Sequence, residues 1–315
     1  MKFLLLFAFL TLVTTTCCSA TPKYPQHINI FHGEGCSADD LFVSRFKPQI
    51  AALGPDVERI LQAVLAKGGP QAGKTYSSLA TFVDRFGPRM TGSQSLEDAI
   101  DYMITRLKKE GHQNVHGEEV EVPVWTRGRE WAEMVAPRHK RLPILGLGYS
   151  VGTTTTAGAT SPTITGNRTL EAPVLVVRSF EELQRRAAEV AGKIVVFNYH
   201  YSNYSAGKGY RMNGASMAAK HGAVAALIRS VTPLSIASPH TGALKYQPNV
   251  VKIPGVSITV EDAEMFQRLA DRKEHIIVRL YSENALSPKA ATSRNTVSEL
   301  VGSRHPEQVV LVSGH

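Results

Sequence analysis

Short apolar runs of strand length alternate with helical stretches between Trp125 and Asn284, and this alternation limits the fold more than any other feature. Residues that cap helices precede two of the helical stretches, since Ser179 begins a capping box with Glu182 and Thr259 begins one with Asp262. Strands that alternate with helices form an α/β domain around a shared core. We therefore predict a compact α/β module here. Its expected strands are Pro173–Val177, Ile194–Phe197, Val224–Ile228 and Ile276–Leu280, and its expected helices begin after Ser179, at Gly214 and after Thr259.

Two amphipathic helices are expected before this module. The first ends at Gly87, and the second begins with a capping box of Ser95 and Asp98 and ends near Gly111. Each carries apolar residues at helical spacing along one face, which indicates that this face covers other apolar surface. These faces are Leu79, Phe82, Val83 and Phe86 in the first helix, and Leu96, Ile100, Met103, Ile104 and Leu107 in the second.

Two strands are expected outside the module. Val120, Val122 and Val124 alternate with other residue types, which predicts a half-buried strand. Val309–Val312 is a continuous apolar run and predicts a fully buried strand that leads directly to His315.

The N-terminus has the order of a secretory signal peptide. Lys2 supplies a positive charge, Phe3–Val13 is an apolar core, and small residues follow up to Ala20, where we expect cleavage. Two of the three cysteines lie in this segment, so the mature chain keeps Cys36, as a free thiol or an intermolecular link. Without an internal disulfide, the fold must depend on a hydrophobic core. No other apolar run approaches the ~20 residues that cross a bilayer, so we expect no membrane span.

The expected secretion gives meaning to two glycosylation sequons. Asn167-Arg168-Thr169 and Asn203-Tyr204-Ser205 both lie among turn-forming residues, where a glycan could be accommodated. We predict that both asparagines are modified.

The charge of the chain is spread along the sequence. The formal net charge is +8, from 35 basic and 27 acidic residues, and the densest basic stretch, 127–141, contains Glu130 and Glu133. This mixture is typical of a solvated surface, with a weak anion-binding face as the alternative, and it does not indicate a nucleic-acid partner.

A complete active site cannot be found from motifs in this sequence. It has no nucleophile elbow, phosphate loop, His-Glu-x-x-His pair or Cys-x-x-Cys pair. His315 directly follows a predicted strand, where α/β sheets collect ligands, and a neutral imidazole is a common zinc ligand. Spacing alone leaves open whether His315 binds metal or is an ordinary surface histidine.

Three parts of the chain resemble one family. Gly87–Ser93, followed by a capped helix, resembles the opening segment of the zinc aminopeptidase-like exopeptidases. Asn295–Val297 together with Pro306–His315 resembles the region that carries the first metal ligand of that family. The stretch between them resembles a protease-associated domain inserted into the peptidase fold, and the whole resemblance extends from about Asp56 to His315.

The resemblance implies an α/β fold, namely an incomplete zinc-exopeptidase α/β sandwich interrupted by an inserted protease-associated α/β domain. Residues 21–52 lack periodicity and are predicted to be a leader or flexible arm, which resembles the removable pro-segment of a zymogen. The implied division is a signal peptide (1–20), a pro-segment-like arm (21–52), the N-terminal part of the peptidase domain (53–124), the protease-associated domain (125–290) and the start of the returning peptidase domain (291–315).

The resemblance also implies a chemistry. His315 matches the ligand histidine of a His-x-Asp motif in a site that holds two zinc ions. The other ligands and the general base match no position here, so no catalytic residue is assigned and we expect the chain, as an N-terminal fragment or truncated form, to be inactive. For the longer enzymes the resemblance implies carboxypeptidase or dipeptidase action on short peptides with free termini and a homodimer. It also implies a secreted or lysosomal location reached through the endoplasmic reticulum and Golgi.

A different class of function competes with this interpretation. The chain could be a secreted, non-catalytic binding module that acts through its protease-associated domain and through loops such as Tyr199–Tyr210, which we expect to be exposed. A transcript that continues past His315, with Asp two positions later, would favour the peptidase.

Overall fold

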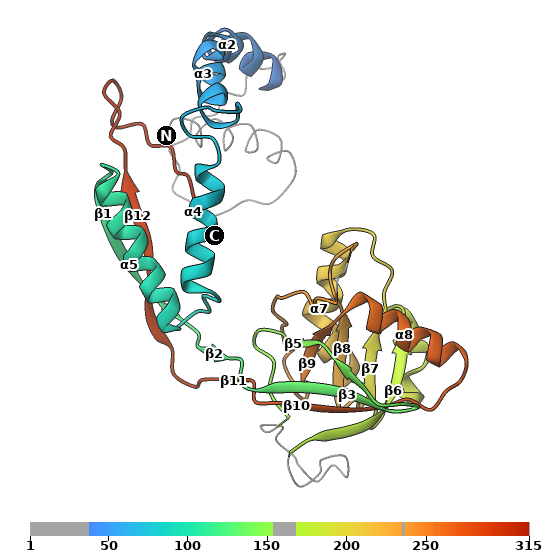
Figure 1. Ribbon diagram of the computed structural model, residues 1–315. Helices are drawn as coiled ribbons and strands as arrows, with labels where there is room; N and C mark the ends of the chain where they lie inside the picture. Colours follow the sequence, from blue (N-terminus) through green and yellow to red (C-terminus); the bar gives the residue numbers. More distant parts are fainter. Residues whose placement is uncertain (1–37, 154–167, 235–236, 315) are drawn as a thin grey trace. The chain divides into compact units, whose positions relative to one another are not determined.

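The computed structural model describes residues 38–153, 168–234 and 237–314, drawn in colour in Figure 1. The predicted signal peptide, Cys36, Asn167 and His315 lie outside the described residues. The chain divides into two compact units. The first comprises Met1–Gly87, Thr105–Val115 and Val297–His315, and the second comprises Pro88–Ile104 and His116–Thr296.

An eight-stranded sheet in the order β4-β3-β10-β6-β7-β8-β9-β5 is the frame of the second unit. The strands β6 to β9 run parallel to one another, whereas β3, β4, β5 and β10 pair antiparallel with their neighbours. Every predicted strand of the module is present. The bounds are β3 Glu130–Ala136, β4 Lys140–Leu142, β5 Ile144–Gly146, β6 Leu170–Val177, β7 Ile194–Phe197, β8 Ala225–Arg229, β9 Gly255–Ile258 and β10 Ile277–Ser282.

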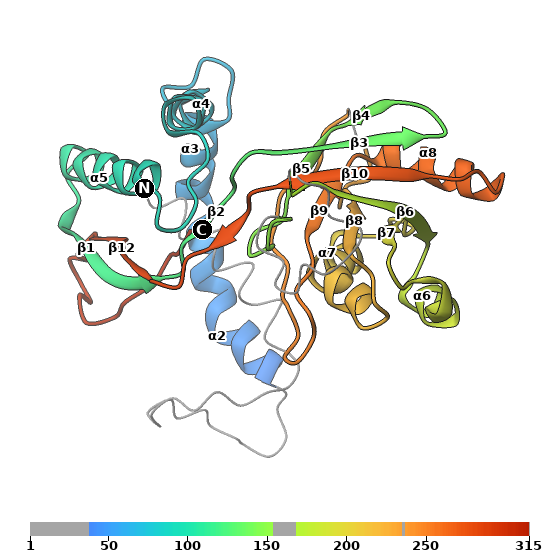
Figure 2. The same ribbon diagram turned by 90° about the horizontal axis from the view of Figure 1, so that it is seen from below.

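Apolar cores lie on both faces of the parallel strands. In β7, Ile194 and Val196 belong to one core, and Val195 and Phe197 belong to the other, so the strand is fully buried. The helix α8 (Val260–Asp271) packs Phe266 into the first core, while α6 (Phe180–Arg185) and α7 (Tyr204–Ala219) cover the second. Figure 2 shows α7 and α8 on opposite sides of the strands. The α/β class is confirmed, because helices cover both faces of a largely parallel sheet.

Side-chain caps fix the starts of these helices. Ser179 accepts a hydrogen bond from the backbone N–H of Glu182, and Thr259 accepts one from Asp262, as the capping boxes predict. The capping prediction for α5 (Gln94–Lys109) is wrong by two residues, because Ser93 and not Ser95 precedes and caps the helix. Ser93 accepts from the N–H of Leu96 at 3.3 Å, whereas the hydroxyl of Ser95 donates to the carbonyl of Pro88.

The helix α7 begins at Tyr204 and not at Gly214, so the predicted exposed loop over Tyr199–Tyr210 is wrong. The glycines in this segment suggest a loop, but in the structure they allow α7 to pack closely against its neighbours. A Cβ atom at Gly207 would lie 2.8 Å from Val231 and 2.9 Å from the hydroxyl of Tyr199. Glycine is therefore required here by contact with a neighbouring element.

The first unit consists mainly of helices with little burial. Residues 38–52, expected to belong to a flexible arm, form the helix α2 (Ala38–Ala52), with Pro48 inside it. The helices α3 (Gly54–Val64) and α4 (Lys74–Phe86) have no buried residue, and Leu79 and Val83 of the predicted apolar stripe are exposed. No helix in the described part of the chain is long and apolar enough to span a membrane.

Two small sheets lie outside the eight-stranded one. The strand β1 (Gln113–Val122) pairs with β12 (Ala291–Glu299), and β2 (Trp125–Thr126) pairs with β11 (Ala285–Leu286). The predicted valine strand is therefore present in part, because Val120 and Val122 belong to the end of β1 whereas Val124 lies beyond it, and Val120 is exposed. The predicted buried strand over Val309–Val312 is wrong, because this run is irregular and exposed. A strand requires a neighbour for its backbone hydrogen bonds, and none of the described strands lies beside this run.

Candidate functional site

The predicted zinc ligand, His315, is not among the described residues. Within the described ranges there is no group of three or more His, Cys, Asp or Glu side chains that could hold a metal ion. A catalytic zinc site uses three protein ligands and an open position. The described residues therefore do not fit a zinc site.

Polar side chains gather instead at the carboxyl ends of the parallel strands, the edge where open α/β sheets bind ligands. Asn198 follows β7, Ser230 follows β8, and Thr259 follows β9. All three are buried, which indicates that the edge is closed by hydrogen bonds. The side chains form two clusters.

The first cluster joins β7, β8 and α8. Arg229 donates from Nη1 to the side-chain oxygen of Asn198 at 2.8 Å and pairs with Glu264 of α8. Because the guanidinium bridges the end of two strands and a helix, this cluster ties α8 to the sheet. Its role is structural.

The second cluster surrounds Arg211 of α7, which is only 6% exposed. The guanidinium donates to the carbonyl of Thr241 at 2.8 Å and to the hydroxyl of Tyr204 at 3.0 Å, and it lies 3.3 Å from Nδ1 of His240. None of these partners is a carboxylate. A Cβ atom at Gly242 would lie 2.3 Å from Cζ of Arg211, so the guanidinium lies flat against that glycine. Arg211 thus holds the loop that contains Thr241 against α7.

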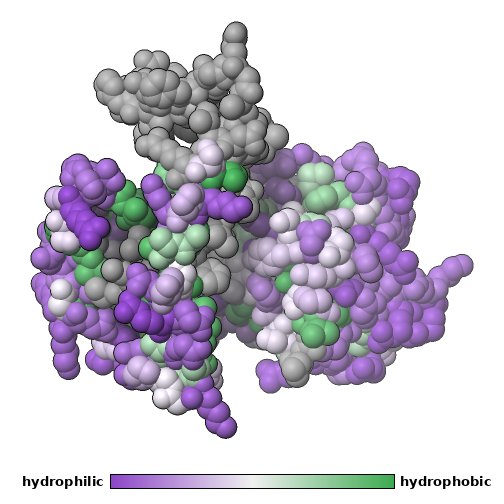
Figure 3. Space-filling model, turned by 90° about the horizontal axis from the view of Figure 1, so that it is seen from above, coloured by the Kyte–Doolittle hydropathy of each residue, from purple (hydrophilic) through white to green (hydrophobic). Residues whose placement is uncertain are grey.

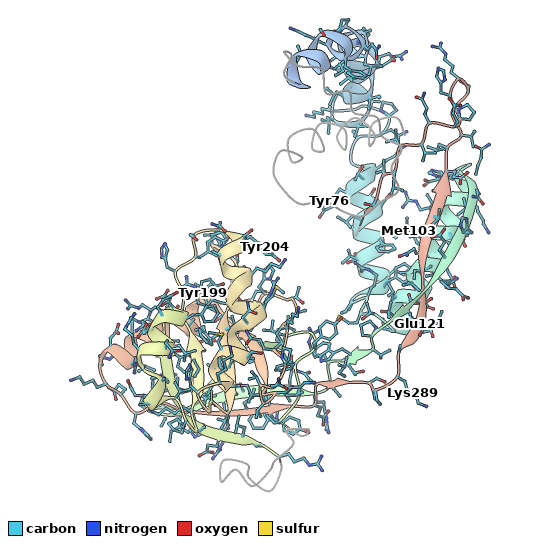
Figure 4. The ribbon with its side chains drawn as sticks, turned by 180° about the vertical axis from the view of Figure 1, so that it is seen from behind. Tyr76, Met103, Glu121, Tyr199, Tyr204 and Lys289 are labelled. Carbon is cyan, nitrogen blue, oxygen red and sulfur yellow. The ribbon has the colours of Figure 1, made fainter. Side chains whose placement is uncertain are left out.

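Tyr199 lies between the end of β8 and α7, and Figure 4 shows it near Tyr204 at the start of α7. Its hydroxyl donates to the carbonyls of Arg229 and Ser230 at 3.2 and 3.3 Å, and its ring stacks on Tyr210 at 4.5 Å. Burial raises the pKa of Tyr199 to about 12, so the phenol remains a protonated donor at physiological pH.

At this edge Tyr204 is exposed and His240 is half-buried, so both side chains present aromatic rings and polar atoms to solvent. Elsewhere, Nδ1 of His112 lies 3.0 Å from the hydroxyl of Ser298, a contact that nucleophilic catalysis could use. A catalytic pair of this kind also needs a third group that orients the histidine. No described hydrogen bond or ion pair supplies such a carboxylate to His112, so the contact ties the residue before β1 to β12.

The sequence-based prediction named Tyr199 and Tyr204 only within the expected binding loop Tyr199–Tyr210, and it named no other residue of these clusters as a site residue. Asn198 could have been found, because it is the polar residue directly after a predicted buried strand. Arg211, Tyr204 and His240 carry no such signal, since a misassigned loop and distant segments bring them together.

The basic stretch 127–141 is divided among separate partners. Arg127 donates to the carbonyl of Gly146 at 3.0 Å and lies 5.2 Å from the ring centre of Trp125. Arg129 pairs with Glu283 at 2.7 Å, and its hydrogen bond is the main cause that lowers the pKa of Glu283 to about 2. The face in Figure 3 is largely hydrophilic with scattered apolar residues.

The predicted glycosylation site Asn203 is exposed and caps α7. Its side-chain oxygen accepts a hydrogen bond from the N–H of Ala206 at 3.0 Å. Glycosylation uses the amide nitrogen, so one asparagine can cap the helix and carry a glycan.

We expect Asn203 to be glycosylated in a secretory host and Asn203→Gln to destabilise the protein by about 1 kcal/mol after deglycosylation, because the cap is lost. Ser205→Ala is the matched control, since it removes the sequon and keeps the cap. Mobility before and after glycosidase treatment, in an Asn167→Gln background, measures the glycan, and urea unfolding measures stability. The same material should begin at Thr21. Equal stability losses in both variants, or no mobility shift, would contradict the prediction.

Comparison with known proteins agrees with the fold. Residues 159–266 match the model of the PA domain. The solved structure of a peptidase M28 precursor from Shewanella amazonensis SB2B is similar, with a TM-score of 0.66 and 25% identity over 84% of this chain and 55% of that one. The chain therefore contains a match to the PA domain, and its fold is similar to that of a peptidase M28 precursor.

Particular relatives are considerably closer in sequence. The chain is 49% identical over 269 residues to carboxypeptidase Q of Bos taurus and 48% identical to carboxypeptidase Q of Homo sapiens, which makes it a homologue of carboxypeptidase Q. Each match covers 85% of this chain and 54% of the relative. The chain thus spans about half the length of these curated relatives.

Proposed function

We propose metallo-exopeptidase function, of the carboxypeptidase or dipeptidase kind, for the protein to which this chain belongs, with short peptides that have free termini as substrates. The observation that carries the proposal is the 49% identity over 85% of the chain. This match extends well beyond the PA domain at 159–266, so it includes flanking peptidase segments as well. The proposed cofactor is zinc.

We further propose that the 315 residues alone do not hydrolyse peptides. Metal-assisted hydrolysis requires a held metal and a base that activates water. The described residues offer no group of ligands for a metal, and one imidazole at His315 would be too few. The segments described here would then contribute fold and recognition, and other residues would perform the chemistry.

We expect the purified chain to hold far less than one zinc ion per molecule and to leave dipeptides intact. The assay is amino-acid release from dipeptides in the presence of zinc, with metal analysis after dialysis and bovine carboxypeptidase Q as the positive control. His315→Ala should change neither result. Hydrolysis that is lost in His315→Ala, or stoichiometric zinc, would overturn the inactivity. A longer transcript product without zinc or activity would overturn the peptidase function.

The proposed place of action is the secretory pathway, with secretion or delivery to lysosomes after passage through the endoplasmic reticulum and Golgi. The signal-peptide pattern before Ala20 and the exposed sequon at Asn203 support it. We also propose a homodimer for the longer enzyme.

A non-catalytic binding module is the second candidate. It is favoured by the unit that contains the PA domain, which has two buried cores and a recognition edge with exposed Tyr204. This candidate requires the whole chain to be a stable unit, which limited proteolysis tests.

A further inference from the structure

Arg211 of α7 carries a buried positive charge that no described carboxylate balances. It is the one arginine among the buried residues of the described ranges. Its guanidinium donates to the carbonyl of Thr241 and to the hydroxyl of Tyr204, and its Nε atom is buried without a hydrogen-bond partner. Burying a charge costs free energy that an opposite charge normally offsets.

Two other arginines of the same unit show the usual arrangement. Arg229 pairs with Glu264, and Arg279 pairs with Glu171. Both arginines are more exposed than Arg211, yet each has a carboxylate partner. Holding a loop carbonyl requires a donor but no charge, since a glutamine amide also donates to a carbonyl. The positive charge of Arg211 is therefore more than the contact with its loop requires.

Tyr204, Lys208 and Arg211 lie along one face of α7. They are spaced by four and three residues, which makes them neighbours on the surface of a helix. Tyr204 is 47% exposed, Lys208 is also exposed, and Cζ of Arg211 lies 5.5 Å from the centre of the Tyr204 ring. Figure 4 shows Tyr204 at the start of this helix. We call these three side chains the cationic face of α7.

The cationic face combines positive charge with a hydrogen-bond donor. Among the described residues Lys208 and Arg211 make no ion pair, and the first turn of α7 contains no acidic residue. The hydroxyl of Tyr204 accepts a hydrogen bond from Arg211 at 3.0 Å, so its own proton remains to be donated. The N-terminal end of a helix also favours negative charge. Each of these features stabilises an anion at the surface of α7.

We propose that the cationic face of α7 binds a carboxylate group. The hydroxyl of Tyr204 and the ammonium of Lys208 donate to its two oxygens, and the guanidinium of Arg211 adds its charge from within the protein. Two donors at the surface match the two oxygens of a carboxylate, whereas a phosphate group presents three. The carboxylate belongs to a peptide, as its C-terminus or as an acidic side chain. Binding needs neither zinc nor hydrolysis, so its failure would leave the proposed function intact.

Isothermal titration calorimetry of the 315-residue chain at low ionic strength, with three blocked dipeptides, tests the proposal. N-acetyl-Ala-Ala has a free C-terminal carboxylate, N-acetyl-Asp-Ala amide has only a side-chain carboxylate, and N-acetyl-Ala-Ala amide has neither. We expect the preferred acid to bind at least about tenfold more tightly than the neutral amide, because charge-assisted hydrogen bonds are the stronger ones. Which of the two acids is preferred identifies the source of the carboxylate.

Substitutions on the cationic face should weaken this binding. Tyr204→Phe keeps the ring and removes the hydroxyl, so it should raise the dissociation constant of the preferred acid by about tenfold. Lys208→Gln should raise it by about threefold, because an exposed charge contributes less. Tyr76→Phe is the matched control on α4, since Tyr76 is 78% exposed, and it should leave the constant unchanged. All three substitutions are at exposed positions, so the variants should fold, which circular dichroism checks.

Three results would overturn the proposal. Equal affinity for the acids and the neutral amide would show that the chain does not recognise the carboxylate. An unchanged dissociation constant in both Tyr204→Phe and Lys208→Gln would place the bound carboxylate away from the cationic face. Tighter binding of inorganic phosphate than of either acid, measured in the same way, would contradict a site matched to two oxygens.

Discussion

Limited proteolysis of the 315-residue chain should remove both flanks and leave a resistant core that contains residues 125–284. Cleavage of a folded protein follows the population of locally opened states. The strands of the PA-containing unit are buried in two cores, whereas α3 and α4 contain no buried residue. We expect the flanking segments to be cleaved at least about a hundredfold faster, the ratio that corresponds to a difference of about 3 kcal/mol in opening free energy.

A time course of digestion with trypsin measures this difference in cleavage rate. The fragments are sized under native conditions and identified by mass spectrometry. Sizing under native conditions is needed because the fragments of a core that is cut at a surface loop stay bound to each other. If residues 53–315 resist digestion as one cooperative unit, the prediction is wrong. A self-standing binding protein would then be the better account of the chain.

The substitution Phe266→Ala should lower the free energy of unfolding by about 3–5 kcal/mol, because the phenylalanine is fully buried between α8 and the sheet. Phe82→Ala is the matched control on α4. Phe82 is half-buried and contacts Phe86 edge-on at 5.1 Å, so its loss should cost about 1 kcal/mol or less.

Urea unfolding followed by circular dichroism gives both values, as a shift of the midpoint at an unchanged slope. The largest change in the circular dichroism signal reports the unfolding of the second unit, which contains both hydrophobic cores. Similar losses of unfolding free energy for the two variants would contradict the prediction. They would mean that the first unit is as well packed as the second, although α3 and α4 contain no buried residue.

The strands and capped helices of the PA-containing unit could be predicted from the sequence, because their signals are local. Ile194–Phe197 matches β7 residue for residue, and Thr259 caps α8 as expected. These signals consist of apolar runs and a capping side chain within one turn.

The rest of the fold and the candidate site could not be predicted, because they depend on contacts between residues that are far apart in the sequence. Val309–Val312 has the composition of a buried strand, yet a strand exists only where another strand accepts its hydrogen bonds. The cluster of Arg211 likewise joins a helix to Thr241, and the pairing is decided by how α7 packs against the loop after β8. Gly207 misled the prediction, because its small size serves a contact with Tyr199 rather than a turn.

The pairing of β2 with β11 has a consequence for how such a module can be inherited. Thr126 faces Ala285 and Trp125 faces Leu286, so the chain enters and leaves the PA-containing module at adjacent positions. An insert with adjacent ends can replace a surface turn of a host protein without separating the two ends of that turn, and it adds little loop-closure entropy. The adjacent ends of this module thus explain how it can lie within another domain's chain without separating the two host segments that it interrupts.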